Sequence, residues 1–328
     1  MKAIRLHEHG GPEVLRYEDV PTPEPKPGEV LVRVHAAGVN PPDWYVRDGM
    51  TTMPGETETT FAFPMTPGTD VSGVVESAAG DFAAGDEVFG MVRFPSFTGG
   101  GYAEYITAPT ADLARKPAGL DHVRAAGVPM AALTAWQYLI EPGHDHPSPF
   151  QARPHRPVPI GQGTTVLVNG AAGGVGHFAV QLAKWQGARV IAVASGGHEE
   201  FLRELGADEF IDYTRARPAE VARDLDLVLD TVGGPAGREF LGTLKPGGAL
   251  FPVFYAEFDA DEVARHGVTV SAAQVRSNGA QLAELGRLLA DGTVRVAIDS
   301  TCPLAEARAA HERAARGHLR GKIVLTVA

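Results

Sequence analysis

The sequence predicts an α/β protein in which a doubly wound parallel sheet is joined to a second, β-rich region. After residue 165, short apolar runs typical of strands alternate with segments of helical spacing, which indicates a parallel sheet with crossover helices. Before residue 124, apolar and polar residues alternate in short runs bounded by Pro and Gly, as in half-buried strands. A chain of 328 residues is long enough for both parts to bury a core.

The expected elements follow from these patterns. In the β-rich region we expect strands at 29–36, 71–77, 87–92 and 103–108, a loop at 50–63 and a helical pattern at 121–139. In the parallel sheet we expect strands at 166–168, 189–194, 209–212, 225–230, 249–253 and 268–271, with helices at 199–205 and 235–244. The last part predicts a helix at 279–291, a strand at 294–298, a helix at 304–317 and a final strand at 322–327. A return of that strand to the first region is compatible with the pattern, which does not itself show the pairing.

Composition and charge exclude several classes of protein. Hydrophobic residues make up 44% and charged residues 21% of the chain, as in a soluble globular protein. The formal net charge of −11 argues against nucleic-acid or anionic-membrane partners, because both attract clustered Lys and Arg. No apolar run can span a bilayer and residues 1–5 enter a strand pattern directly, so we expect a cytoplasmic protein. The single cysteine, Cys302, excludes an internal disulfide and a cysteine-rich zinc site.

The run TVLVNGAAGGVGHFAVQLAKWQG, which starts at Thr165, carries the clearest functional pattern. An apolar strand meets a glycine cluster and then a segment of helical spacing, so backbone N–H groups at the helix N-terminus favour a bound phosphate. Three residues match the G-x-G-x-x-G spacing, with Ala at the first position: Ala171, Gly173 and Gly176. We expect Gly174 and Val175 to contact the same dinucleotide. The alternative is a tight strand-to-helix turn without a ligand.

The end of the second strand of the parallel sheet bears on the choice of cofactor. An acid at this place would hold the adenosine ribose and repel a 2′-phosphate, but no carboxylate occupies it. Ser195 can donate to a phosphate oxygen, and His198 can add positive charge. The pattern therefore favours NADP(H). The alternative is that Ser195 and the glycines after it only form a turn, and Glu199 and Glu200 follow closely.

A proline-rich stretch at 141–163 contains three histidines, His144, His146 and His155. A metal site is conceivable there. We favour a solvated surface excursion, because the prolines prevent a regular scaffold and no supporting acid pattern is evident.

Several segments together resemble one family, the zinc-independent quinone oxidoreductase branch of the medium-chain dehydrogenase/reductases. The resemblance covers nearly the whole chain through AAGVNPPDWYVRDG, FPMTPGTDVSGVV, GGYAEY, MAALTAWQYL, the glycine turn, LGADEFIDY, LDTVGG and RGKIVL. It implies a GroES-like β-rich catalytic domain built from both chain ends and a central Rossmann domain. The implied domains are residues 1–123, 124–272 and 273–328, and the implied assembly is a homodimer formed through the nucleotide domain.

The resemblance also implies a site without a metal. Asn40 stands where the zinc alcohol dehydrogenases of this superfamily have a cysteine ligand, and Thr69-Asp70 stands where they have a His-Glu pair. Asn40 then matches a residue that orients the nicotinamide ribose, with an Asn-Pro turn as the alternative. Tyr45 matches a tyrosine of the substrate pocket, and Thr134 matches a residue beside the nicotinamide. Either side chain can instead be simply packed.

Further cofactor contacts are implied around the adenosine. Ser195, His198 and Tyr213 match the adenosine-phosphate pocket, where a lysine is commoner than His198. Lys322 matches a residue that approaches the same phosphate, with an exposed edge-strand charge as the alternative. Val232 is also expected at the cofactor.

The implied activity is hydride transfer from NADPH to a quinone or an α,β-unsaturated carbonyl. Aromatic residues that can supply a flat wall are Phe61, Phe63, Phe94 and Phe97. Two alternatives stay open: an enoyl-thioester reductase, and a protein that binds NADPH without turnover. Against the first, Thr51 occupies the position that corresponds to the catalytic tyrosine of such reductases.

Overall fold

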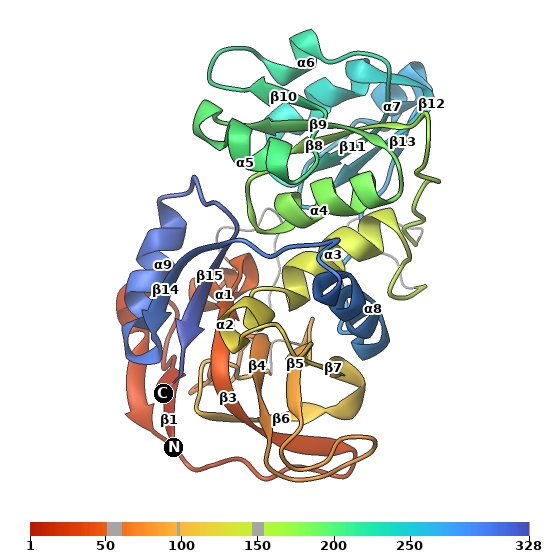
Figure 1. Ribbon diagram of the computed structural model, residues 1–328. Helices are drawn as coiled ribbons and strands as arrows, with labels where there is room; N and C mark the ends of the chain where they lie inside the picture. Colours follow the sequence, from red (N-terminus) through yellow and green to blue (C-terminus); the bar gives the residue numbers. More distant parts are fainter. Residues whose placement is uncertain (51–60, 97–98, 146–153, 328) are drawn as a thin grey trace.

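Two sheets dominate the fold, a parallel one and a largely antiparallel one, and they stand one above the other (Figure 1). The computed structural model describes residues 1–50, 61–96, 99–145 and 154–327. The chain crosses between the two sheets near α3 and returns at its C-terminal end. Both architectures expected from the sequence are therefore present.

The parallel sheet has six strands in the order β10-β9-β8-β11-β12-β13. Its strands are β8 (Thr165–Asn169), β9 (Arg189–Ala194), β10 (Glu209–Asp212), β11 (Leu225–Asp230), β12 (Leu244–Pro252) and β13 (Thr269–Val270). The associated helices are α4 (Gly174–Trp185), α5 (Glu199–Glu204), α6 (Pro218–Val221) and α7 (Ala260–His266). The strand order reverses direction between β8 and β11, so the carboxyl ends of these two strands flank the crevice where such sheets bind ligands.

The second sheet has seven strands and combines both ends of the chain. Its order is β14-β15-β3-β4-β5-β7, with β6 also paired to β3. The strands are β3 (Glu29–Val39), β4 (Asp70–Val75), β5 (Glu87–Met91), β6 (Tyr105–Pro109), β7 (Leu113–Arg115), β14 (Ile298–Pro303) and β15 (Lys322–Thr326). A separate two-stranded sheet contains β1 (Lys2–Arg5) and β2 (Arg16–Asp19). The final strand does return to the first region, where it pairs antiparallel with β3.

The helical pattern at 121–139 is two helices rather than one. α2 (His122–Ala126) ends at Gly127, and α3 (Pro129–Leu139) begins with a proline at its first position, where a missing N–H costs nothing. Every residue of α3 is buried. It belongs to the core that continues into the parallel sheet, and α8 (Gly279–Ala290) packs beside it.

Two other expectations about elements are corrected. The predicted helix at 235–244 is a 3₁₀ helix over Pro235–Thr243. The predicted strand at 294–298 is wrong, because a strand begins only at Ile298. Side chains of α4 hold the backbone of the preceding segment in place of a neighbouring strand. Gln181 exchanges two hydrogen bonds with the backbone of Arg295 (2.9 and 2.7 Å), and His177 Nε2 accepts from Ala297 N–H at 3.3 Å.

In its described part the proline-rich stretch is mostly half-buried or exposed, as a surface excursion should be, but it is anchored to the core at His155. His155 is buried, its Nε2 donates to the carbonyl of Tyr138 (3.0 Å) and its Nδ1 accepts from the Ser271 hydroxyl (2.9 Å). The ring packs edge-on against Phe251, with 4.6 Å between ring centroids. His144 donates to the carbonyl of Gln274 at 2.7 Å. These contacts tie the stretch to the nucleotide domain. His146 lies outside the described residues.

The remaining short elements are α1 (Pro41–Arg47), α9 (Ala307–Ala315) and the 3₁₀ turns over Pro12–Val14, Thr110–Asp112, Gly196–His198 and Leu304–Glu306. The predicted helix at 304–317 thus consists of a 3₁₀ turn followed by α9. Among the described residues, no helix combines the length and apolar character needed to cross a bilayer.

The buried imidazole of His177 generates a prediction about stability and pH. Burial lowers the pKa of His177 from 6.5 to about 4. Between these values the unfolded chain binds a proton that the folded protein does not, so the free energy of unfolding falls as the pH drops, by roughly 2 kcal/mol between about pH 7.5 and about pH 5. His177→Gln removes this titration. In urea unfolding, the stability of the wild type relative to this variant should fall by that amount over the same pH range.

The same substitution at His266, which is exposed on α7, controls for the loss of a histidine from the chain. A stability difference between wild type and His177→Gln that is equal at both pH values would contradict the buried, neutral state of His177.

Candidate active site

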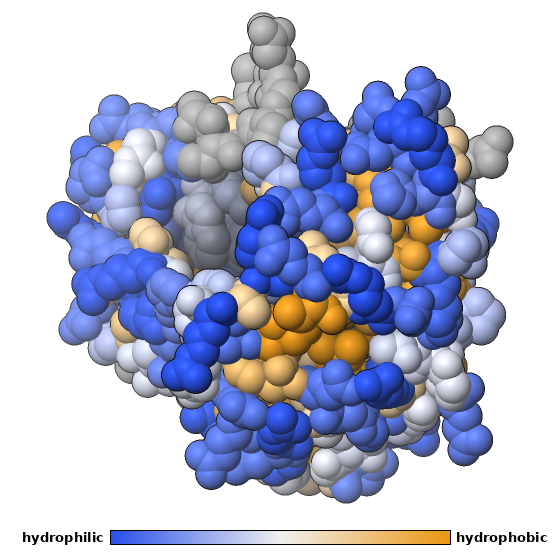
Figure 2. Space-filling model, turned by 90° about the horizontal axis from the view of Figure 1, so that it is seen from above, coloured by the Kyte–Doolittle hydropathy of each residue, from blue (hydrophilic) through white to orange (hydrophobic). Residues whose placement is uncertain are grey.

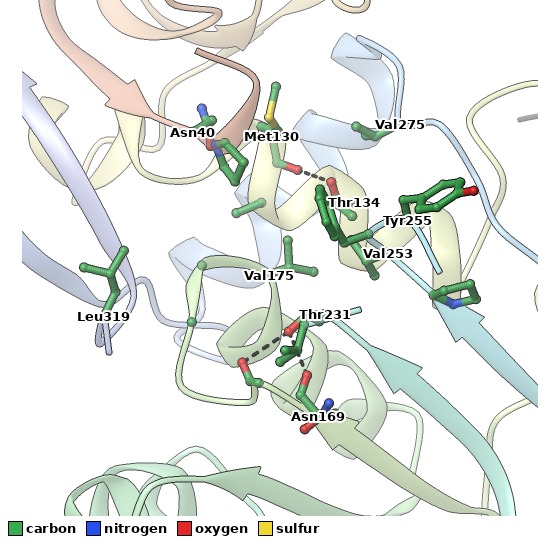
Figure 3. A pocket seen from close by; sticks show the side chains of 18 of the residues that line it. Asn40, Met130, Thr134, Asn169, Val175, Thr231, Val253, Tyr255, Val275 and Leu319 are labelled. Carbon is green, nitrogen blue, oxygen red and sulfur yellow. Dashed lines mark hydrogen bonds between the residues drawn. The ribbon is translucent and has the colours of Figure 1, made fainter. Parts of the chain in front are cut away.

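A cleft of about 1200 Å³ lies at the carboxyl ends of β8 and β11 and reaches into the seven-stranded sheet. It is larger than most small-molecule pockets, which span roughly 300–1000 Å³. Figure 3 shows side chains from several parts of the chain around it: Asn40 from the β-rich region, Met130 and Thr134 from α3, and Asn169, Val175 and Thr231 from the parallel-sheet region. The cleft has room for an extended ligand that touches both domains.

The glycine turn forms the floor of the cleft. Gly173 is the N-cap of α4 and makes no side-chain cap, so the N–H groups of the first helical turn depend on a ligand or solvent. Gly174 and Val175 line the cleft as expected. Ala171 and Gly176 do not. A Cβ on Gly176 would lie 2.2 Å from the carbonyl oxygen of Gly170, so this glycine allows the helix to pack against the strand.

Asn40 begins a helix that the sequence patterns miss. Two prolines follow it, which suggest a turn, but they occupy the first positions of α1, where proline is tolerated. The backbone N–H of Asn40 donates to the carboxylate of Asp43 at 2.8 Å. The Asn40 side chain is 1% exposed, lines the cleft and donates from Nδ2 to Asp70 at 3.0 Å. Asn40 is therefore both the N-cap residue of α1 and one of the residues that line the cleft.

Two buried carboxyl groups, those of Asp43 and Asp70, accept hydrogen bonds from Asn40. Asp43 also accepts a hydrogen bond from the Tyr102 hydroxyl at 2.9 Å, and burial raises its pKa to about 7. Asp70 accepts from the N–H of Met130 at the start of α3 (3.0 Å), and burial raises its pKa to about 6. Both groups fix backbone at the ends of elements that border the cleft, which agrees with a structural role for Asp43.

Lys322 is buried in the lining of the cleft, and its head group bonds Asn40. It is 4% exposed, on a strand with neighbours on both sides, so the alternative of an exposed edge charge is wrong. Its ammonium group donates to Val39 O at 2.8 Å and to Asn40 Oδ1. Lys322 lines the cleft, but its head group is engaged with Asn40 rather than left for an adenosine phosphate.

Thr134 and Tyr45 both line the cleft. The Thr134 hydroxyl donates to the carbonyl of Met130 at 2.7 Å, which leaves its oxygen as an acceptor toward the cleft (Figure 3). The ring of Tyr45 lies 5.8 Å from that of Phe254, and burial raises the pKa of Tyr45 to about 12. Tyr45 thus keeps its proton over the whole physiological pH range and can act as a donor.

The other end of the cleft contains the expected Ser195, His198 and Tyr213, and Val232 also lines it. His198 Nδ1 is buried without a hydrogen-bond partner among the described residues. Burial and the nearby charges of Arg320 and His318 lower the pKa of His198. An unpartnered ring nitrogen among positive groups suits an anionic ligand.

Two residues at this end are missed by the sequence patterns. His318 lines the cleft and its Nδ1 lies 3.3 Å from the Tyr213 hydroxyl. Arg320 stacks its guanidinium on Phe201 at 4.2 Å from the ring centroid. The available signal was the basic run RGHLRGK before the final strand, which contains both residues.

Of the aromatic residues expected to form a flat wall, only some line the cleft. Phe94 lines the cleft, whereas Phe61 and Phe63 pack edge-on against His9. Thr51 and Phe97 lie outside the described residues. Within the described ranges, no group of three His, Cys, Asp or Glu side chains is placed to hold a metal ion.

Comparison with known proteins agrees with this architecture. Residues 26–118 match the family described as alcohol dehydrogenase GroES-like domain, and residues 205–325 match the family described as zinc-binding dehydrogenase. The chain is 34% identical to the NAD(P)H oxidoreductase RTN4IP1, mitochondrial, of Mus musculus, over 100% of this chain and 89% of that protein. That relative is named as mitochondrial, and a cytoplasmic location for this chain stays a prediction.

Solved structures give the same result. The quinone oxidoreductase from Coxiella burnetii is 32% identical, with a TM-score of 0.86 over 100% of this chain and 99% of that one. The mycobacterial protein Rv1454c complexed with NADPH is 28% identical, with a TM-score of 0.82 over 99% and 100% of the two chains. The chain therefore belongs to the quinone oxidoreductase branch of the medium-chain dehydrogenase/reductase superfamily and is an NAD(P)H-type oxidoreductase.

Proposed function

We propose that this protein is an NADPH-dependent reductase that transfers hydride to a quinone or an α,β-unsaturated carbonyl without a metal ion. The observation that carries the proposal is the position of the α4 N-terminus. Gly173 and Gly174 lie in a cleft that has Asn40 and Thr134 at one end and Ser195 and the other adenosine-end residues at the other. Uncapped N–H groups midway along the cleft suit the pyrophosphate of a dinucleotide.

A preference for NADPH is supported by the charges at the adenosine end. The end of β9 carries Ser195 and no carboxylate, and the nearby residues that can carry positive charge are His198, His318 and Arg320. Glu199 and Glu200, which follow that loop, do not line the cleft, and Asp212 at the end of the neighbouring β10 accepts hydrogen bonds from Thr214 and does not line it either. A 2′-phosphate would thus meet donors and positive charge rather than a repelling carboxylate.

The residues of the nicotinamide end can bind and orient, and they exclude water. When bound, the cofactor supplies the hydride. Asn40 and Thr134 present polar atoms for a ribose or carboxamide, and Val253 and Val275 face them with apolar side chains (Figure 3). Tyr45, with its proton held by a raised pKa, can donate to a substrate carbonyl oxygen as negative charge develops there.

The apolar lining supports a flat, uncharged electrophile as substrate. Tyr45, Phe254 and Phe94 offer aromatic surface in this part of the cleft. The remaining candidates of the sequence, an enoyl-thioester reductase and a protein that binds NADPH without turnover, are outcomes of the test below.

We also propose the implied homodimer. β13 ends the parallel sheet on one side, and the face of the molecule seen from above carries apolar side chains gathered near its centre (Figure 2).

Steady-state oxidation of NADPH with a quinone, an enone and an acyl thioester such as crotonyl-CoA tests the function. We expect turnover with the quinone or the enone. Turnover with the thioester alone would assign an enoyl-thioester reductase. Fluorescence-detected binding of NADPH with no oxidation by any electrophile would reject the reductase.

The adenosine end generates a prediction about cofactor selectivity. His198→Ala removes the ring that can bond the 2′-phosphate, so its affinity for NADPH should fall by about tenfold or more, as for the loss of a hydrogen bond to a charged group. Affinity for NADH, titrated on the same variant, should change little and is the internal control. An equal loss for both cofactors would place His198 outside the phosphate pocket.

The substrate end generates a second prediction. Tyr45→Phe keeps the ring but removes the donor, so kcat should fall by roughly 10- to 100-fold while NADPH affinity is unchanged. Tyr105→Phe, on β6 and outside the cleft, is the matched control and should keep wild-type kcat. A wild-type kcat in Tyr45→Phe would show that the hydroxyl takes no part.

A further inference from the structure

Lys322 and Asn40 come from opposite ends of the chain and meet in the lining of the cleft. The Lys322 ammonium donates to Asn40 Oδ1 and, at 2.8 Å, to the carbonyl of Val39, the residue before it. An ammonium group that is 4% exposed carries a large desolvation cost unless its partners are close and charged. The nearby charges are the carboxylates of Asp70 and Asp43.

Asp70 holds the other end of the same amide. Its Oδ2 accepts from Asn40 Nδ2 at 3.0 Å, and its two oxygens accept from the N–H of Met130 at 3.0 and 3.1 Å. An ammonium group has donors only and a carboxylate has acceptors only. The Asn40 amide therefore has one satisfied orientation, with its oxygen toward Lys322 and its nitrogen toward Asp70. A flipped amide would set donor against donor and acceptor against acceptor.

We propose that Lys322 is a positioning residue for the nicotinamide end of the cleft, where it fixes the side-chain amide of Asn40 in the orientation that the bound cofactor meets. The proposal rests on the proposed function and deepens it. It replaces the expectation that Lys322 serves the adenosine phosphate.

The path of the Lys322 side chain supports this assignment. Its Cδ lies 3.1 Å from the place where a Cβ on Gly174 would stand, so the stem passes close against the phosphate-binding turn. The head group continues past the turn to Asn40. Lys322 thus spans the central part of the cleft, and its charge lies at the Asn40 end, whereas Ser195, His198 and Tyr213 form the adenosine end.

Binding of two ligands to Lys322→Met separates the two roles. The ligands are NADPH and 2′,5′-ADP, which has the adenosine half and its phosphates but no nicotinamide. We expect about a tenfold loss of affinity for NADPH, as for the loss of one hydrogen bond from the displaced Asn40 amide to the cofactor, with the affinity for 2′,5′-ADP within about twofold of wild type. A parallel loss for both ligands would return Lys322 to the phosphate pocket and overturn the proposal.

A double-mutant cycle tests whether Lys322 acts through Asn40. In an Asn40→Ala background, Lys322→Met should cause no further loss of NADPH affinity or of kcat, because the amide that it positions is gone. Additive losses would overturn the proposal. Lys116→Met is the matched control: Lys116 is also buried, bonds the carbonyls of Leu120 and Pro117, and lies outside the cleft. Its NADPH affinity should equal that of wild type.

Removal of the Lys322 charge leaves Asp70 buried and unpaired, so Lys322→Met combined with Asp70→Asn provides a second, charge-neutral variant. It should show the same selective loss for NADPH, and an affinity equal to wild type for both ligands would overturn the proposal. If the wild type itself binds neither ligand, the proposed function fails and the role of Lys322 fails with it. If it binds NADPH but reduces no electrophile, only the reductase fails, and the binding comparison still decides the role of Lys322.

Discussion

The antiparallel pairing of β15 with β3 is the constraint on which the cleft depends. It sets Ile323 opposite Val39 and so brings the first residue of the final strand beside Asn40. The segment before the strand is fixed as well, because Gly321 donates from its N–H to the carbonyl of Ala172 at 2.8 Å. Gly321 has a φ of +85°, and a Cβ there would lie 2.1 Å from the carbonyl oxygen of Ala297. One segment thus touches the glycine turn and the catalytic sheet at once.

Charge burial makes this arrangement cooperative. Lys322, Asp70 and Asp43 are each nearly inaccessible to water. The two carboxyl groups favour the charge of Lys322, whereas Asp43 itself is stabilised mainly by hydrogen bonds from Asn40 and Tyr102. In a low-dielectric interior, the loss of Lys322 leaves the two buried carboxyl groups without their counter-charge, whereas the intact set defines a single geometry. The polar chain continues from Asp43 through Tyr102 to His311, whose pKa burial and the neighbouring Arg47 lower to about 3. Polar side chains thus connect the nicotinamide end to the interior of the seven-stranded sheet.

Most of the fold could be predicted because its signals are local. The strands at 189–194, 209–212 and 225–230 match at both ends, since a buried parallel strand is a short apolar run bounded by turn residues. The errors involve partners that are distant in sequence. Residues 294–297 have a strand pattern, but Gln181 and His177 supply the hydrogen bonds that a strand would. His155 is polar and follows a proline-rich run, yet Tyr138 and Ser271 bury it.

The candidate site, like the fold, could be predicted only where its signals are local in sequence. Glycine spacing located the phosphate turn, although Gly176 and Ala171 shape the turn from behind rather than line the cleft. Spacing alone cannot show where the long side chain of Lys322 ends.

The discontinuous sheet also sets an order of assembly during synthesis on the ribosome. Strands β8 to β13 form one continuous stretch, so the nucleotide sheet has all its members while one edge of β3 still waits for β15. The cleft becomes complete only after β15 has been synthesised.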